Sequence, residues 1–151
     1  LARESLHLGA ASERTVGDLM GPPVPPLREN TPFRAIAQRF LTSPNNFLPV
    51  VDDGQRLVGL VSLHDLKEYL GAGAELDSVI AADVMRPVPA VLTPDRRLTD
   101  ALPVLLASEL RNVPVVNNLV ERRLIGAVAR SEALSLLSEA ISARTSVGRE
   151  A

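Results

Sequence analysis

Leu48-Pro49-Val50-Val51 returns 65 residues later as Val113-Pro114-Val115-Val116, and this repetition decides the fold. Further along the chain, Leu57-Val58-Gly59-Leu60-Val61 returns 67 residues later as Leu124-Ile125-Gly126-Ala127-Val128. The two extra residues of the second copy fall between these segments, where a surface turn accepts an insertion readily. Because the register is kept on both sides of the insertion, the sequence contains an internal duplication.

The order of predicted elements is the same in both copies. Each copy opens on an Asp-x-Met segment, which is Asp18-Leu19-Met20 in the first and Asp83-Val84-Met85 in the second. A proline-rich segment follows, and because proline has no N–H for a ladder, it is predicted as an edge strand or a partly irregular one. A helix, two strands joined by a hairpin and a second helix complete each copy. The predicted elements are residues 22–27, a helix capped by Thr31-Pro32, strands 47–51 and 56–62 and helix 63–70 in the first copy, and residues 87–92, a helix capped by Asp95 and a closing helix 131–141 in the second.

These elements predict an α+β fold in which two pseudo-symmetric β-α-β-β-α repeats pack through their sheets into one module. A single repeat would bury its apolar strand face poorly, whereas two repeats packed face to face share a core. The predicted boundaries are a flexible N-terminal segment at 1–14, the first repeat at 15–70, a glycine-rich linker at 71–78, the second repeat at 79–142 and a flexible C-terminal tail at 143–151.

The composition argues against several classes of function. Hydrophobic residues make up 46% and charged residues 23% of the 151 residues, which is the balance of a globular domain. The net charge of −2 gives no reason to expect nucleic acid, and the absence of cysteine excludes disulfides, thiolate metal sites and cysteine nucleophiles. His7 and His64 have no metal-ligating residues at a suitable spacing, so no metal site is expected. No Ser-His-Asp arrangement, phosphate-binding glycine loop or paired-carboxylate cleft points to an enzyme.

The order of these motifs resembles the CBS domain family over residues 15–142. The family's recurring features are the Asp-x-Met segment, an apolar-Pro-Val strand and a Gly-x-x-Ser/Thr-x-x-Asp motif at the end of the last strand. The first copy matches that motif in full from Gly59 to Asp65, whereas the second has Ala129 and Glu132 at the last two positions. The resemblance implies a tandem CBS pair (a Bateman module), a non-catalytic regulatory unit that senses AMP, ADP or ATP between the repeats and requires no cofactor.

The turn from Ser62 to Asp65 suits a nucleotide on chemical grounds. At a strand-to-helix turn, a serine hydroxyl and the first N–H groups of the helix face an incoming phosphate. A carboxylate three residues on can accept both hydroxyls of a ribose. The resemblance implies that the other copy completes the site, with its first strand against adenine and an arginine against phosphate. The nucleotide-binding residues predicted in this way are Gly59, Ser62, His64, Asp65, Val91, Leu92 and Arg111.

A weaker second site is expected on the mirror-image side, because Ala129 has no side-chain donor and Glu132 is longer than aspartate. An alternative interpretation makes Ser62 and Asp65 an ordinary helix N-cap box, Glu132 a cap and Arg111 a solvated residue at a helix end. We expect one competent site and one weak or empty site. The residues of the weaker site are Pro26, Leu27, Asn45, Asn46 and Glu132.

Within the family, residues 51–66 and 79–85 resemble the cytoplasmic C-terminal region of prokaryotic ClC-type chloride channels and transporters. This resemblance implies a cytoplasmic module that controls a covalently attached transmembrane domain in an inner-membrane ion-transport protein. A homodimer through the helical faces is also expected, with Leu134, Leu136 and Leu137 as the contact if they face outward from the shared core. Two alternatives remain open: a ligand-free structural and dimerisation module, and a stand-alone CBS protein that regulates another enzyme or transporter.

Overall fold

The structure, a computed structural model, describes residues 14–73 and 75–150, and side chains up to residue 143. The flexible segment predicted at 1–14 falls outside the described residues except for Arg14, and His7 falls outside as well. The first repeat contains α2 (Val16–Leu19), β1 (Leu27–Arg28), α3 (Phe33–Thr42), β2 (Phe47–Val51), β3 (Leu57–Ser62) and α4 (Leu63–Gly71). The second contains η1 (Leu76–Ser78), α5 (Ala81–Val84), α6 (Leu98–Ala107), β4 (Asn112–Val116), β5 (Leu124–Ala129) and α7 (Arg130–Glu150).

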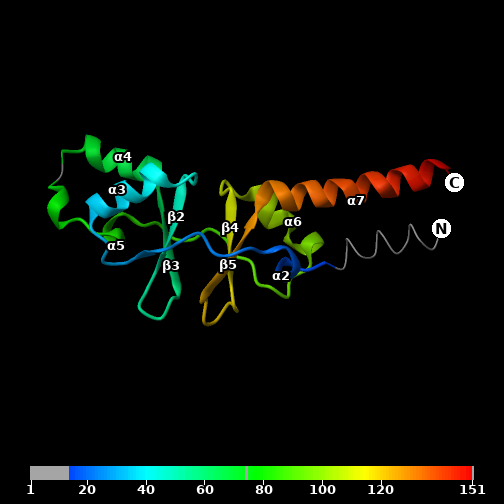
Figure 1. The fold of residues 1–151 in the computed structure, drawn as a ribbon, viewed down its shortest axis with the longest axis horizontal. Coiled ribbons are helices and arrows are strands. Elements are labelled where there is room, and N and C mark those ends of the chain that lie inside the picture. Colours follow the sequence, from blue (N-terminus) through cyan, green and yellow to red (C-terminus); the bar gives the residue numbers. More distant parts are fainter. Residues whose placement is uncertain (1–13, 74, 151) are drawn as a thin grey trace.

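Two antiparallel hairpins stand side by side at the centre, and the longer helices lie toward the outside (Figure 1). In the first hairpin Phe47 pairs with Ser62, and in the second Asn112 pairs with Ala129. β1 adds a short parallel strand to β2, whereas the second repeat makes only an isolated parallel bridge from Leu92 to Val115. The predicted α+β fold of two repeats is confirmed, and the proline-rich segments pair as little as their sequence predicts.

Three predicted helix boundaries were wrong. α7 continues to Glu150, although the closing helix was predicted to end at residue 141; the predicted flexibility of residues 143–151 stays a prediction. Pro32 and not Thr31 is the N-cap of α3, because the Thr31 hydroxyl accepts the N–H of Arg28 at 3.0 Å and belongs to the preceding turn. α6 begins after Arg97 and has no side-chain cap, so Asp95 does not cap it.

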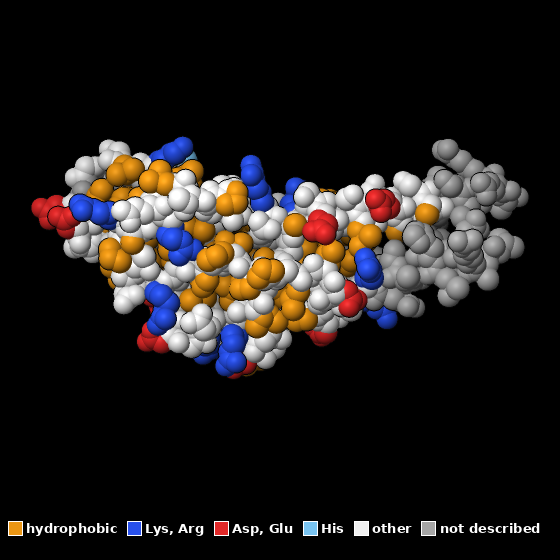
Figure 2. All heavy atoms as spheres, in the orientation of Figure 1, with side chains coloured by type: hydrophobic (Ala, Val, Ile, Leu, Met, Phe, Trp, Pro, Cys, Tyr) orange, Lys and Arg blue, Asp and Glu red, His pale blue; other side chains and the backbone are white. Residues whose placement is uncertain are grey.

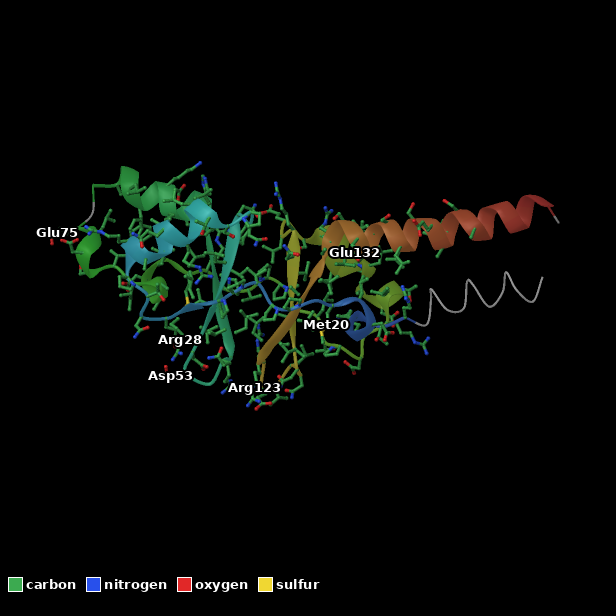
Figure 3. All side chains as sticks on the ribbon, viewed as in Figure 1. Met20, Arg28, Asp53, Glu75, Arg123 and Glu132 are labelled. Carbon is green, nitrogen blue, oxygen red and sulfur yellow. The ribbon has the colours of Figure 1, made fainter. Side chains whose placement is uncertain are left out.

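The Asp-x-Met segments are exchanged between the repeats. In the first copy, the N–H of Val16 donates to Arg96 O at 2.8 Å, and Val16 is buried among residues of the second repeat. In the second copy, the N–H of Ala81 donates to Thr31 O at 2.9 Å, which places α5 on the first repeat. Figure 1 shows this exchange as α2 beside α6 and α5 beside α3, and Figure 3 shows Met20 beside β5. Each structural lobe is therefore built from both sequence repeats.

A glycine in each last strand allows the exchanged segment to cross. An added Cβ at Gly59 would lie 2.8 Å from Met85 Sδ and 3.0 Å from the carbonyl oxygen of Arg86. At Gly126 it would lie 2.9 Å from the carbonyl oxygen of Gly21. The contacts under 3.0 Å are closer than a Cβ normally approaches, and the contact at 3.0 Å is tighter than most, so a side chain at either glycine would force the crossing segment to shift.

The hydrophobic core consists of two clusters, one in each lobe. The first is centred on Leu27, Ile36 and Val61, and the second on Leu92, Leu98 and Leu105. Leu60 of the first repeat belongs to the second cluster, so the two lobes join at the strand that carries the Gly-x-x-Ser motif. Among the described residues, the helices lack the length and apolar character needed to cross a bilayer.

Candidate functional site

Ser62 marks the point where β3 ends and α4 begins. Its Oγ accepts the N–H of Asp65 at 3.0 Å, and the residue is 3% exposed. The hydroxyl thus acts as the helix N-cap, and a hydrogen bond from the Ser62 side chain also helps to lower the pKa of Asp65. The cap holds the first N–H groups of α4 at the cleft between the repeats, where the positive end of the helix favours an anion.

Asp65, in the first turn of α4, is paired with Arg86 from the exchanged segment of the other repeat. Arg86 Nε donates to Oδ2 at 2.8 Å and Nη2 donates to Oδ1 at 2.7 Å, so both carboxylate oxygens are engaged. The bond from Arg86 lowers the pKa of Asp65 against the opposing effect of its burial, and it raises the pKa of Arg86. The Asp65 side chain is 17% exposed and that of Arg86 is 47% exposed, so the pair lies at the surface of the cleft.

A cavity of about 570 Å³ opens between the two repeats beside this ion pair. The first repeat contributes Phe47 and Leu60, and the segment after Arg86 and the end of α6 supply the other walls. A largely apolar cavity with a few polar groups is the usual form of a small-molecule site. The walls from the second repeat are Arg86, Pro87, Pro89, Ala90, Val104, Ala107, Ser108, Glu109 and Leu110.

A second cavity of about 390 Å³ adjoins the first and is more polar. The two share Phe47, Arg86 and Glu109 as lining residues. The polar cavity is also lined by Asn46, Ser62, Leu63, His64 and Lys67. Arg86, Lys67 and the N-terminus of α4 bring positive charge to this cavity, which Glu109 offsets in part. Cationic side chains at a helix N-terminus are a common arrangement for binding phosphate.

The family model for the CBS domain matches residues 16–72 and 81–139. The chain belongs to the CBS domain family. It contains two CBS repeats, and the relatives and solved structures that resemble it agree with this assignment. CBS pairs are regulatory rather than catalytic.

CBSX2 from Arabidopsis thaliana is one similar solved structure, with 28% identity and a TM-score of 0.69 over 83% of this chain and 95% of CBSX2. A crystal structure of CBSX2 in complex with AMP has the same identity and a TM-score of 0.66, and it covers 83% of this chain and 97% of that one. Inosine-5'-monophosphate dehydrogenase from Halobacterium salinarum is 33% identical over 67% of this chain and 19% of the enzyme.

An uncharacterized protein from Methanocaldococcus jannaschii is 29% identical over 85% of this chain and 44% of its own length. The chain thus spans less than half the length of the curated relatives it matches.

The CBS pair places some of the predicted site residues at the cleft and others elsewhere. Ser62 and His64 line the polar cavity. Asp65 lies behind Arg86 and lines a third cavity with Glu68, Tyr69 and Asp83. Gly59 lies against Met85 and the backbone of Arg86, so the close crossing of these segments explains why a glycine stands there. Whether Ser62, His64 and Asp65 bind a nucleotide stays a prediction.

Val91 and Leu92 are not among the residues that line the apolar cavity, and whether either contacts an adenine stays a prediction. The N–H of Leu92 donates to Pro114 O at 3.1 Å and its carbonyl accepts the N–H of Val116, which turns the fully buried side chain into the core. Val91 is half-buried outside the lining, and Pro87, Pro89 and Ala90 form the wall instead.

Asn46 and Arg111 each lie beside the strand-to-helix turn of their own copy, and whether either contacts a nucleotide stays a prediction. Phe47, which follows Asn46, pairs with Ser62, and Asn112, which follows Arg111, pairs with Ala129. This hairpin register brings the backbone of each residue to its own turn. Asn46 O accepts the N–H of Leu63 at 3.0 Å and Asn46 lines the cavity with Ser62. Arg111 O accepts the N–H of Arg130 at 2.9 Å, and its guanidinium donates to Pro44 O at 3.4 Å.

The remaining residues predicted for the weaker second site lie in different surroundings, and whether they bind a ligand stays a prediction. Leu27 is 1% exposed and belongs to the core of the first lobe. Asn45 accepts a hydrogen bond from Asn112 at 2.8 Å, which links the two repeats. Pro26 O accepts a bond from Arg39 at 3.4 Å. Glu132 is exposed in the first turn of α7 (Figure 3).

Sequence reasoning missed Arg86, Phe47 and Glu109. Arg86 had a visible signal, because the equivalent position in the first copy is Gly21. A difference between copies at a position next to a repeated motif marks a residue that the shared fold does not require.

Proposed function

We propose that this CBS pair is a regulatory module that binds an adenosine nucleotide, AMP in the first place, in the cleft between the repeats. The observation that carries the proposal is the apolar cavity of about 570 Å³ that opens onto a polar cavity beside Ser62 and Arg86. A flat apolar base and an anionic phosphate need these two environments side by side. The AMP complex of CBSX2, a structure with the same two-repeat fold, supports the choice of ligand.

The proposed orientation follows from the linings of the two cavities. Adenine occupies the larger cavity, with Phe47 on one side and Pro87 and Pro89 on the other. The phosphate occupies the polar cavity, where Ser62 can donate its hydroxyl hydrogen and the N-terminus of α4 and Lys67 supply positive charge. The ribose then lies near the Asp65–Arg86 pair that separates this cavity from the third one.

Such a ligand would contact both repeats at once. Its base touches β2 and the segment after Arg86, and its phosphate touches α4. Binding therefore favours the arrangement of the repeats that brings these surfaces closest together. A regulated partner senses the ligand only to the extent that the nucleotide binds this arrangement more tightly than the others. This is the proposed means of regulation.

Isothermal titration calorimetry with AMP, ADP, ATP and GMP tests the proposal. Ser62→Ala removes the phosphate donor and the helix cap together, so AMP is expected to bind about tenfold more weakly. Thr15→Ala is the matched control, since Thr15 caps α2 with the same geometry and does not line the cleft. It should lose comparable stability and keep wild-type affinity. Equal affinity of wild type and Ser62→Ala would contradict the proposed placement of the phosphate.

We propose further that the module acts as a CBS protein that regulates a separate enzyme or transporter. The comparisons give no support to the predicted attachment to a chloride channel, whereas CBSX2 is a solved chain almost wholly matched by this CBS pair. Immunoblotting of the native protein with antibodies to this chain distinguishes the two. A native protein that stays in the soluble fraction after the membranes are removed supports a separate CBS protein, and one that fractionates with the membranes and is released only by detergent supports an attached transmembrane domain.

A dimerisation role is the second candidate, because large apolar side chains are exposed on the helices. Leu41 of α3 is 84% exposed, and Leu70 of α4 and Leu106 of α6 are more than half exposed. Of the three leucines predicted as the contact, Leu137 is buried in the core, whereas Leu134 and Leu136 pack against it and remain partly exposed. Sedimentation of Leu41→Lys and Leu70→Lys tests this role, which predicts a shift from dimer to monomer relative to wild type.

Apolar side chains also gather over the middle of the face in Figure 2, where the repeats meet.

A further inference from the structure

Arg86 stands where the three cavities meet. It lines the apolar cavity, the polar cavity and the third cavity that contains Asp65. Its backbone is fixed, because its N–H donates to Leu60 O at 2.8 Å and its carbonyl accepts the N–H of Leu60 at 3.0 Å. The guanidinium extends from this fixed point across the cleft to the carboxylate of Asp65.

The fold does not require an arginine at this position. Gly21, the equivalent residue of the first copy, makes the same pair of backbone bonds with Ala127, at 2.9 and 3.1 Å. The exchanged segment can therefore cross without any side chain here. What Arg86 adds to the first site is its bidentate contact with Asp65, whereas Gly21 offers no such partner to the exposed Glu132 of the second copy.

The contact places Arg86 in competition with a ribose. Both oxygens of Asp65 accept bonds from the guanidinium, and the Asp65 side chain is only 17% exposed, so the arginine covers most of the access that ribose hydroxyls would need to the remaining acceptor sites of the carboxylate. A phosphate in the polar cavity offers the planar guanidinium a second anion with matching geometry. The side chain of Arg86 is about half exposed and already lines that cavity, so the exchange needs no movement of the backbone.

We propose that Arg86 makes nucleotide binding depend on the ligand's phosphate, because it releases Asp65 only when a phosphate replaces the carboxylate as its partner. This inference rests on the proposed function of the cleft. AMP exchanges one charged partner of Arg86 for another and frees Asp65 for the ribose. Adenosine must break the ion pair and gives Arg86 nothing in return. Arg86 is thus a specificity-determining residue that rejects the nucleoside.

Calorimetric titration of AMP and adenosine into wild type and Arg86→Gly tests the inference. Arg86→Gly copies the Gly21 of the other repeat, and Arg86→Gln is a second variant that keeps backbone stiffness and side-chain length. Wild type is expected to bind AMP about 10- to 100-fold more tightly than adenosine. In both variants adenosine should bind more tightly than it does to wild type and AMP more weakly, so that the ratio falls by about tenfold or more.

Arg123→Ala is the matched control, because it removes another exposed ion pair, with Glu121 at 3.0 Å, at the tip of the β4–β5 hairpin (Figure 3). It should keep the wild-type ratio. If adenosine binds the Arg86 variants no better than wild type while AMP still binds wild type, the proposed function stands and this inference is overturned. If folded wild type binds neither ligand at millimolar concentration, the proposed function fails and the inference fails with it.

Discussion

Gly59→Ala is expected to destabilise the protein through the crossing of the exchanged segment over β3. The new methyl group would lie 2.8 Å from Met85 Sδ and 3.0 Å from the carbonyl oxygen of Arg86. The Met85 side chain can turn aside, but the Arg86 carbonyl is held by its bond from the Leu60 N–H. Overpacking of this kind costs about 1–3 kcal/mol. For a domain of this size, a loss of about 2 kcal/mol lowers the midpoint of thermal unfolding by about 4–8 °C.

Urea unfolding of three glycine variants measures this effect. Gly126→Ala should cost at least as much as Gly59→Ala, because its nearest contact is a backbone oxygen, Gly21 O at 2.9 Å. Gly71→Ala is the control, since an added Cβ there meets nothing within 4 Å at the end of α4. It should be neutral or stabilise by about 0.4–1 kcal/mol. Wild-type stability of Gly59→Ala would refute the close crossing, and with it the exchange of the Asp-x-Met segments.

Three further predictions concern stability. Leu105→Ala should lower the free energy of unfolding by about 2–5 kcal/mol, because Leu105 is fully buried in the second cluster. Its neighbour Leu106 is exposed, so Leu106→Ala should change that free energy by less than about 0.5 kcal/mol, and chemical denaturation compares the two variants. Thr15→Ala should cost about 0.5–2 kcal/mol through loss of the α2 capping box, and unchanged stability would show that the box contributes nothing. Asp65 has a lowered pKa in the folded state, so its ion pair stabilises the folded protein above about pH 4. This contribution is lost as the pH falls through the folded-state pKa. Unfolding measured at a series of pH values should therefore show wild type losing its stability advantage over Asp65→Asn below about pH 4.

The duplication made most of the fold predictable. The apolar-Pro-Val and Gly-x-x-Ser segments recur in register, so each hairpin and the two-repeat architecture follow from the sequence. Helix ends were less predictable because local cap signals compete, as at Thr31, whose hydroxyl bonds to Arg28 in the preceding turn. The exchange of the Asp-x-Met segments could not be predicted, since either repeat offers these segments the same backbone partners.

The site was predictable where one turn determines it and unpredictable where two repeats meet. Ser62 and Asp65 share the strand-to-helix turn, so their proximity follows from three residues of sequence. Asn46 and Arg111 were predicted to act across the cleft, whereas hairpin register places the backbone of each beside its own turn. Arg86 reaches Asp65 only because its segment crosses to the other repeat, which no local pattern reveals.

The stoichiometry of AMP binding tests the central claim most directly. The cleft that contains Ser62 and Arg86 has a hydroxyl donor and an arginine, whereas Ala129 and Gly21 stand at the equivalent positions of the other cleft. Calorimetric titration at a chain concentration well above the dissociation constant should therefore give one AMP per chain. Two equivalent sites would contradict the assignment to a single cleft, and no binding would contradict the nucleotide-sensing function itself.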